Sequence, residues 1–421
     1  MNSKFQDTLM KYMMPVANRL EQQKHLQAIK DGMIAVIPII IVGSVSLLPL
    51  AIANLFGSGA IYEFLNRYMG VFTYAGKFTS DMISIYAAFF IAAALAKSYG
   101  IYTNQTGATA IMVHLILSGL AIEGGLDISY LGASGLFTSM VSAILSVEVT
   151  RFMMEKKLTI RLPDSVPVMV GESFGALLPL VMNAVLAVII ANLSLGIGGK
   201  VFPAFVMGLL APAISTMDTL PALLIVVFLT QFLWFFGLHG PSITSAVWAS
   251  FAIAYEAENV ANFAAGLPVT HIFTYGFYYS IIQLTGSGLT LGLVILMMRS
   301  KAKSLKAIGT AGIVPSIFGI NEPIIFGMPI ILNPFMFIPF VFGPMLITLI
   351  SYFAMTSGLV GKPIAAPPGF LPPGVAAFIM TLDWKCVVLA LAGLVIMTII
   401  YYPFFKMMEA SEIKKEQEAE A

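Results

Sequence analysis

The sequence predicts an all-α integral membrane protein, and its composition and its apolar runs both support this fold class. Of its 421 residues, 58% are hydrophobic and only 10% are charged, and the mean hydropathy is +0.91. An ordinary soluble domain has roughly 25% charged residues, so most of this chain must face lipid or other apolar segments. Several runs approach the roughly 20 residues with which a helix crosses the hydrocarbon core; examples are 33–55, 181–195 and 387–405.

The apolar runs, and the Gly and Pro residues that break them, predict about ten transmembrane helices. Their centres are expected near residues 43, 87, 113, 142, 184, 229, 250, 284, 344 and 394. An even number of crossings places most of the 22 Lys and Arg residues on the side of the N-terminus, as the positive-inside rule requires. We therefore expect a multi-pass protein with both termini in the cytoplasm.

The chain is expected to divide into two membrane domains joined by an amphipathic connector. Residues 1–30 are predicted to form a cytoplasmic interfacial segment, and 31–196 a first domain of five spans. The connector is expected at 197–218. A second domain at 219–405 then precedes a cytoplasmic tail at 406–421.

Two apolar stretches of the second domain are expected to form re-entrant hairpins. They cover residues 307–330 and 358–381, and both are broken by Gly and Pro. Irregular backbone at membrane depth is tolerated only where it is buried in protein or lines a cavity. These two elements are therefore expected to border a site.

Glu322 is the first candidate site residue, because it places a carboxylate inside an apolar segment. Carboxylates at membrane depth usually mark substrate or ion paths. Asn321 precedes it and Pro323 follows it, which interrupts a regular helix and frees backbone groups for a ligand. A carboxylate beside an amide suits a polyhydroxyl ligand. The alternative is a structural ion pair with Lys or Arg, which we favour less because no basic residue lies nearby in the sequence.

His239 is the second candidate, at the point where an aromatic span ends in Gly-Pro. A histidine can both donate and accept hydrogen bonds, and Gly237 and Gly240 allow a ligand to approach closely. The alternative is a histidine that is bonded only within its own helix end. His114 and His271 are each expected to satisfy a local hydrogen bond.

The remaining reactive and aromatic residues are given structural roles. Cys386, the single cysteine, is expected to be a small core residue. The aromatic residues at 234–236 and 275–279 could stack on sugar rings, but core or lipid-facing roles are favoured for each. No Walker sequence, dinucleotide fingerprint, metal-spaced Cys/His cluster or catalytic triad occurs. We therefore expect no cofactor and no metal.

Three motifs, in their order and spacing, make the chain resemble a known family. They are LPDSVP at 162–167 running into SFGALLP at 173–179, then WFFGLHG at 234–240, then GINEPIIFG at 319–327 with Asn333-Pro334 beyond. Over nearly the whole chain, the sequence resembles the membrane-spanning IIC permease (EIIC) of the bacterial phosphoenolpyruvate-dependent sugar phosphotransferase system (PTS), in its lactose/cellobiose/diacetylchitobiose family.

The resemblance implies a function, an assembly and partners. It implies a homodimer in the bacterial cytoplasmic membrane, held by the first five spans, whose later spans and hairpins form a moving sugar site. Glu322 and His239 would act near the hydroxyl that accepts phosphate, and Asn321 and Gly240 would also contact the sugar. The phosphoryl group would come from a cysteine of a separate IIB chain, charged through IIA. The chain would thus be the permease subunit of a sugar phosphotransferase complex.

The second hairpin departs from the family pattern. Relatives read PWTTPP there, whereas this chain has IAAPPGF at 364–370. Side chains that would touch sugar are therefore missing, and Phe370 is expected to stack on the ring in their place. The expected substrate is a β-linked disaccharide of the cellobiose, diacetylchitobiose or lactose type, with the choice left open.

Two other functions remain as alternatives. In a proton-coupled secondary transporter, Glu322 would load and release the coupling proton. In an intramembrane enzyme, Glu322 and His239 would act as an acid/base pair on a lipid-linked substrate. Uptake that follows a pH gradient and needs no phosphorylated IIB would favour the first, and product formation by the purified chain alone would favour the second.

Overall fold

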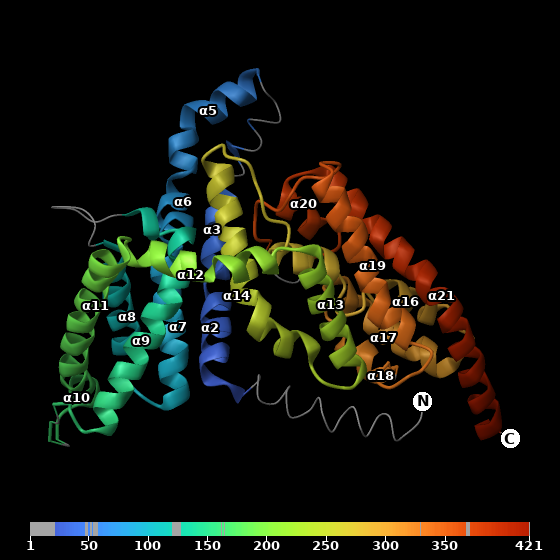
Figure 1. Ribbon diagram of the computed structural model, residues 1–421. Helices are drawn as coiled ribbons and strands as arrows, with labels where there is room; N and C mark the ends of the chain where they lie inside the picture. Colours follow the sequence, from blue (N-terminus) through green and yellow to red (C-terminus); the bar gives the residue numbers. More distant parts are fainter. Residues whose placement is uncertain are drawn as a thin grey trace. The chain divides into compact units, whose positions relative to one another are not determined.

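The regular secondary structure of the described residues is almost entirely α-helical, as Figure 1 shows. The structure is a computed structural model that describes residues 22–46, 49–50, 53, 58–119, 128–160, 162–163, 165–328, 330–367 and 371–420. Over these ranges the one β feature is an isolated bridge between Leu284 and Gly286. The predicted fold class is confirmed.

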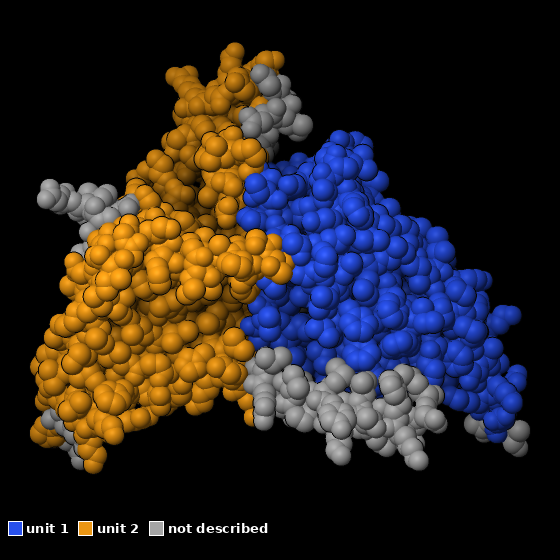
Figure 2. Space-filling model, in the orientation of Figure 1, with its two compact units in different colours: residues 1–19, 217–248, 269–421 blue, residues 20–216, 249–268 orange. Residues whose placement is uncertain are grey.

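The described chain forms two compact units, coloured separately in Figure 2. Unit 2 consists of Leu20–Thr216 and Ala249–Pro268, and unit 1 includes Met217–Trp248 and Val269–Ala421. The helices that lie wholly in unit 2 are α2 (Lys24–Ala35), α3 (Ile37–Ser46), α5 (Ala60–Phe72), α6 (Tyr74–Phe78), α7 (Ile83–Tyr99), α8 (Thr103–Gly119), α9 (Leu136–Glu155), α10 (Val168–Gly175) and α11 (Leu177–Gly198).

The remaining helices belong to unit 1 or to its borders. Helix α12 (Phe202–Met217) ends where unit 1 begins, and α14 (Gly240–Ala264) has residues in both units. Unit 1 also contains α13 (Leu220–Phe235), α15 (Tyr275–Phe277), the π-helix η4 (Tyr278–Ile282), α16 (Leu291–Met298), α17 (Lys303–Ile317), α18 (Glu322–Gly327), α19 (Phe337–Thr356), α20 (Val375–Thr381) and α21 (Trp384–Glu420).

Within the described ranges, six helical stretches are long and apolar enough to cross a membrane, and the broken pair α12 and α13 gives a seventh. They match the predicted centres near 43, 87, 142, 184, 229, 344 and 394. The other three centres fall on weaker helices: α8 has 17 residues, α14 carries Glu256 and Glu258, and the stretch near 284 is divided among α15, η4 and α16. These three segments are helical at the predicted positions, but each is shorter, more charged or more broken than a continuous apolar span.

Small residues let the helices of unit 2 pack closely. A Cβ atom on Gly32 of α2 would lie 2.5 Å from the backbone of Ile91 in α7, so this crossing requires glycine. Helices α8 and α11 meet through Val113, Leu117, Ala187 and Ala191, which are all buried. Without a hydrophobic force between lipid-embedded helices, such close packing is a main source of their association.

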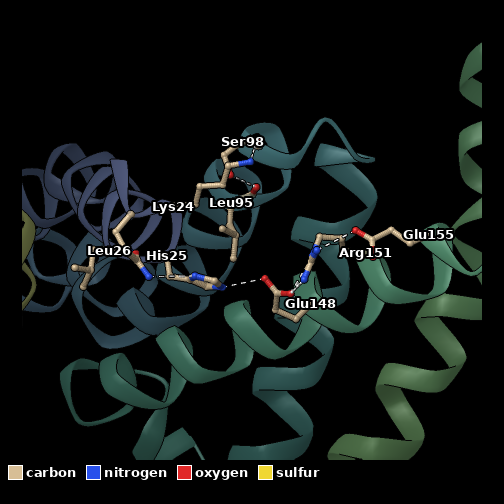
Figure 3. Close-up of polar contacts among 9 residues, drawn as sticks. Lys24, His25, Leu26, Leu95, Ser98, Glu148, Arg151 and Glu155 are labelled. Atoms are coloured by element: carbon tan, nitrogen blue, oxygen red, sulfur yellow. Dashed lines mark hydrogen bonds and ion pairs between the residues drawn. The ribbon is translucent and has the colours of Figure 1, made fainter. Parts of the chain in front are cut away.

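A polar cluster that the sequence did not reveal joins three helices of unit 2. Figure 3 shows Glu148 of α9 between His25 of α2 and Arg151, with an Oε1–Nε2 distance of 2.9 Å to His25 and an Oε2–Nη2 distance of 2.6 Å to Arg151. Lys24 donates to the Ser98 carbonyl of α7 at 2.9 Å. The ends of α2, α7 and α9 are thus held by charge-assisted hydrogen bonds, which are stronger than neutral ones.

Aromatic side chains form much of the packing in unit 1. Phe228 and Phe235 of α13 contact Phe342 and Phe337 of α19, with ring centroids 6.1 and 4.9 Å apart. Trp248 of α14 lies 4.1 Å from Tyr278 of η4, centroid to centroid. The two Phe–Phe distances fall in the range in which aromatic pairs attract beyond their area burial, and the Trp248–Tyr278 contact is closer still.

The C-terminal part of α21 holds the first turn of α17. Glu416 accepts hydrogen bonds from the backbone N–H groups of Lys303 (3.0 Å) and Ser304 (2.8 Å). Glu409, about two turns earlier, accepts from the Ser300 hydroxyl at 2.7 Å and the Lys301 N–H at 2.9 Å. A carboxylate at a helix N-terminus satisfies donors that have no partner within the helix.

Candidate functional site

His239 lies in the turn between α13 and α14. Gly237, with φ of +82°, reverses the chain, and Gly240 begins the next helix. The His239 ring is exposed, and its Nδ1 accepts a hydrogen bond from the Ser242 N–H at 3.1 Å. A neutral imidazole that accepts at Nδ1 carries its proton on Nε2, so His239 can present a donor to a ligand.

Gly240 is buried, and packing requires a glycine at this position. A Cβ atom here would lie 2.0 Å from the carbonyl oxygen of Thr230 in α13, a separation that cannot occur without backbone movement. The sequence predicted a close ligand approach at Gly240. The close approach that the structure shows is that of α13 itself.

Glu322 is the first residue of α18, after a turn that begins at the end of α17. Gly319 has φ of +79° and Asn321 precedes the helix. Glu322 was predicted as a carboxylate at membrane depth inside an apolar segment, whereas the structure shows it exposed at the start of α18, immediately before Pro323. The ion pairs found among the described residues do not include Glu322. The structural alternative of a Lys or Arg partner therefore has no support there.

Asn321 turns the other way, into the core of unit 1. Its Nδ2 donates to the Ser287 carbonyl at 2.6 Å and to the Thr290 hydroxyl at 2.9 Å, and the residue is 4% exposed. Its two amide hydrogens are thus engaged within the protein. This positioning role is one that the sequence missed, since it depends on a loop more than 30 residues away.

The segments of His239 and Glu322 meet at Trp234. The Trp234 ring lies 4.7 Å from the His239 ring and 6.0 Å from the ring of Phe326, centroid to centroid. Phe326 follows Glu322 by one turn of α18. After α18, the Leu332 N–H donates to the Phe235 carbonyl at 2.9 Å. The structure therefore brings together the two candidate segments, which are about 80 residues apart in the sequence.

A buried chain of hydrogen bonds also joins the two segments. It begins at Thr244, which donates to the Gly240 carbonyl at 3.0 Å, and ends at Asn321. The Thr244 and Thr230 hydroxyls are 2.8 Å apart, and the Tyr278 hydroxyl donates to Thr230 Oγ1 at 3.3 Å. Gln283 Nε2 donates to the Tyr278 hydroxyl at 3.3 Å, and the Ser287 hydroxyl donates to Gln283 Oε1 at 2.9 Å. Asn321 Nδ2 then donates to the backbone carbonyl of Ser287 at 2.6 Å. Buried hydrogen-bond networks favour one arrangement of the side chains in a core.

The other histidines and Cys386 have the structural roles expected of them. His114 Nε2 lies 2.7 Å from the Ser84 hydroxyl, and His271 Nδ1 lies 2.8 Å from Asp218 Oδ2. Cys386 and Tyr278 are fully buried. The described residues contain no group of three His, Cys, Asp or Glu side chains that could hold a metal ion.

The second Pro-rich element folds back on α20. The N–H groups of Ile364 and Ala365 both donate to the Met380 carbonyl, at 2.8 and 3.1 Å. Phe370, the predicted stacking residue, lies outside the described residues.

The fold and this site define a multi-pass α-helical membrane carrier with an exposed carboxylate on a broken helical hairpin. The family model for the phosphotransferase system EIIC matches residues 30–344. The crystal structure of the transporter ChbC, the IIC component of an N,N'-diacetylchitobiose-specific phosphotransferase system, superposes with a TM-score of 0.87 at 31% identity and covers 97% of this chain and 99% of that one.

Two relatives from Bacillus subtilis (strain 168) are similar over almost their whole length. The chain is 33% identical to the lichenan permease IIC component, covering 99% of this chain and 96% of the relative. It is 32% identical to the oligo-beta-mannoside-specific EIIC component, covering 98% and 96%. The chain belongs to the EIIC family of bacterial phosphotransferase-system sugar permeases, in its lactose/cellobiose/chitobiose branch.

Proposed function

We propose that this permease carries a β-linked disaccharide of the cellobiose, diacetylchitobiose or lactose type inward and presents its 6-hydroxyl for phosphorylation. The observation that carries the proposal is the meeting of the His239 turn and the Glu322 hairpin at Trp234. The similarity to permeases for lichenan, oligo-β-mannosides and diacetylchitobiose, which are all β-linked, supports this substrate class.

The proposed chemistry uses one acceptor and one donor. The Glu322 carboxylate accepts the hydrogen bond of the 6-hydroxyl and takes its proton as the hydroxyl oxygen attacks phosphorus. The new O–P bond forms while the S–P bond to a cysteine of a phosphorylated IIB protein breaks. His239 Nε2–H donates to the sugar and holds the hydroxyl in line. Phosphorylation then traps the sugar, because the charged ester cannot return across the membrane.

The proposed assembly is a homodimer held by the first five spans, with both termini in the cytoplasm. IIB and IIA act as separate chains, and the later spans move the sugar across the membrane in an elevator-like step. The distribution of Lys and Arg supports this orientation, and the division into two compact units supports separate holding and moving parts. Phe370 is proposed as a stacking face for the sugar ring.

The proposal can be tested with proteoliposomes that enclose phosphorylated IIB. Labelled cellobiose, lactose or diacetylchitobiose is added to the outside. The wild-type protein should accumulate the sugar phosphate, and Glu322→Gln should abolish this accumulation without changing the dimer or the melting temperature. Glu63→Gln, at an exposed carboxylate of α5, is the matched control and should transport normally. Uptake that needs no IIB and follows a pH gradient would instead identify a proton-coupled carrier.

A further inference from the structure

Gln231 of α13 is a fully buried amide without a hydrogen-bond partner among the described residues. Its exposed fraction is 0%, and neither Oε1 nor Nε2 meets a donor or acceptor among the residues that the structure describes. The large majority of buried side-chain polar atoms are hydrogen-bonded in native proteins, because a polar group loses its bonds to water on burial. A carboxamide that leaves both its donor and its acceptor unused therefore requires an explanation.

The position of Gln231 on α13 relates it to the candidate site. Residues three and four apart lie on one face of a helix, so Gln231 lies one turn before Trp234 and Phe235. Trp234 contacts His239 and Phe326, while Phe235 packs on Phe337 of α19. The Gln231 amide thus lies inside unit 1, on the helix face that ends at the His239 turn.

A second unpartnered polar atom lies on the same face. The Trp234 indole is 3% exposed, and its Nε1–H has no acceptor within the described ranges. By contrast, the hydroxyl of Thr230, next to Gln231, is fully engaged with the Val226 carbonyl, Thr244 and Tyr278. Among the described residues of α13, the buried side-chain polar atoms without a partner therefore belong to Gln231 and Trp234, one turn apart on the same helix face.

We propose that Gln231 and the indole N–H of Trp234 bind ring hydroxyls of the transported sugar and select among sugars by them. This inference rests on the function proposed above and extends its site along α13. A carboxamide offers an acceptor and two donors, which matches two neighbouring hydroxyls of a neutral pyranose. A buried group that bonds a substrate hydroxyl rejects analogues lacking that hydroxyl, because the group is then left unpaired.

Binding calorimetry on the purified full-length protein tests the proposal with cellobiose, lactose and diacetylchitobiose. The variants are Gln231→Leu, which keeps the volume but removes the polar atoms, and Trp234→Phe, which keeps a ring but removes the N–H. Each should raise the dissociation constant of the best-binding sugar at least about tenfold. Gln105→Leu in α8 is the control, because its Oε1 is also buried without a partner but lies in unit 2, and its binding should match wild type.

Melting temperatures without sugar distinguish a ligand role from a structural one. Gln231→Leu removes two unmet polar atoms, so its melting temperature without sugar should equal or exceed that of wild type. A lower melting temperature together with unchanged binding would overturn the inference and indicate a buried water as the partner. If the wild-type protein binds none of the three sugars, the proposed function is wrong. If wild type and Gln231→Leu bind a sugar equally well, only the inference about Gln231 is wrong.

Monodeoxy analogues of the best-binding sugar give a second, independent test. Removing the hydroxyl that Gln231 binds should weaken binding to wild type but leave binding to Gln231→Met nearly unchanged, because the interaction is already absent there. Met resembles Gln in length and flexibility, so this variant also serves if Gln231→Leu does not fold. Equal losses in both proteins for every deoxy analogue would refute the assignment.

Discussion

Asn321 donates a hydrogen bond to the backbone carbonyl of Ser287 at 2.6 Å. A Cβ atom on the neighbouring Gly286 would lie 2.3 Å from the Asn321 amide carbon, so the loop can approach this closely only because residue 286 is glycine. The contact anchors the backbone one residue before Glu322. It therefore fixes the carboxylate of the site although the amide itself points away from it.

Asn321→Ala should destabilise the protein much more than Glu322→Gln. The variant leaves the Ser287 carbonyl and the Thr290 hydroxyl buried without a donor, at a cost of about 2–4 kcal/mol for the two bonds. Thermal unfolding in detergent measures the effect. Asn192→Ala, whose amide bonds only the Val188 carbonyl on an exposed face of α11, should change stability by less than about 0.5 kcal/mol. Similar melting temperatures for all three variants would contradict the anchoring role.

Substitutions of His239 can distinguish the roles of its two ring nitrogen atoms. His239→Asn keeps an acceptor near the Nδ1 position for the Ser242 N–H, while His239→Gln places a donor near the Nε2 position. His239→Ala should weaken sugar binding by about 1–3 kcal/mol. Calorimetry should then show that Gln restores part of the affinity and Asn does not. An unchanged isotherm for His239→Ala would exclude this residue from the site.

Gly240→Ala should disrupt the packing of α13 against α14. The added methyl group would lie 2.0 Å from the Thr230 carbonyl oxygen, which forces the helices apart and costs at least about 1–3 kcal/mol, as overpacking generally does. We expect a lower melting temperature and slower transport. Gly171→Ala in α10 has open space around the new methyl group and should leave both properties unchanged. A Gly240→Ala protein with the melting temperature and transport rate of wild type would show that α13 and α14 can move apart without loss of stability or function.

Glu148→Gln should loosen the junction of α2, α7 and α9. It removes the charge that His25 and Arg151 share, and we expect a loss of about 1–2 kcal/mol, since the cluster is partly exposed. Glu155→Gln removes only the exposed pair with Arg151 and should cost less than about 0.5 kcal/mol. The difference between the two variants should shrink in high salt; a difference of zero at low salt would show that the cluster does not stabilise the fold.

Glu416→Gln should weaken the start of α17. The carboxylate accepts from the N–H groups of Lys303 and Ser304, so its neutralisation should speed amide hydrogen exchange at these two residues. Glu418→Gln, at a carboxylate that pairs only with Lys414 at 3.8 Å, is the matched control. Equal exchange in the two variants would mean that α17 begins without help from α21.

The sequence was sufficient for the helical class and for the break that carries Glu322. Gly319 and Pro323 flank the turn between α17 and α18, and both are visible in the sequence as residues that interrupt a helix. The apolar stretch near 284 was predicted as one span, yet Gly286 and Gly288 adopt φ of +84° and +82° and end the regular helix after η4. Here the Gly-Ser-Gly signal was present but was outweighed by hydropathy.

The contacts that complete the site could not be predicted from one sequence. The partners of Asn321 lie more than 30 residues away, and Glu148 meets His25 across 123 residues. Local patterns predict helices and turns, but they do not specify which turn approaches which helix. Trp234 was named only among possible stacking aromatics, and its contacts with His239 and Phe326 became visible only in the structure.

Helix α21 has 37 residues, which corresponds to a length of about 55 Å at 1.5 Å per residue. A bilayer core is only about 30 Å thick, so this helix projects into water as a stalk. Glu409 and Glu416 of this helix are hydrogen-bonded to Ser300 and Ser304, at the start of α17. We therefore expect a tilt of the stalk to displace the start of α17 as well, because these hydrogen bonds would otherwise have to break.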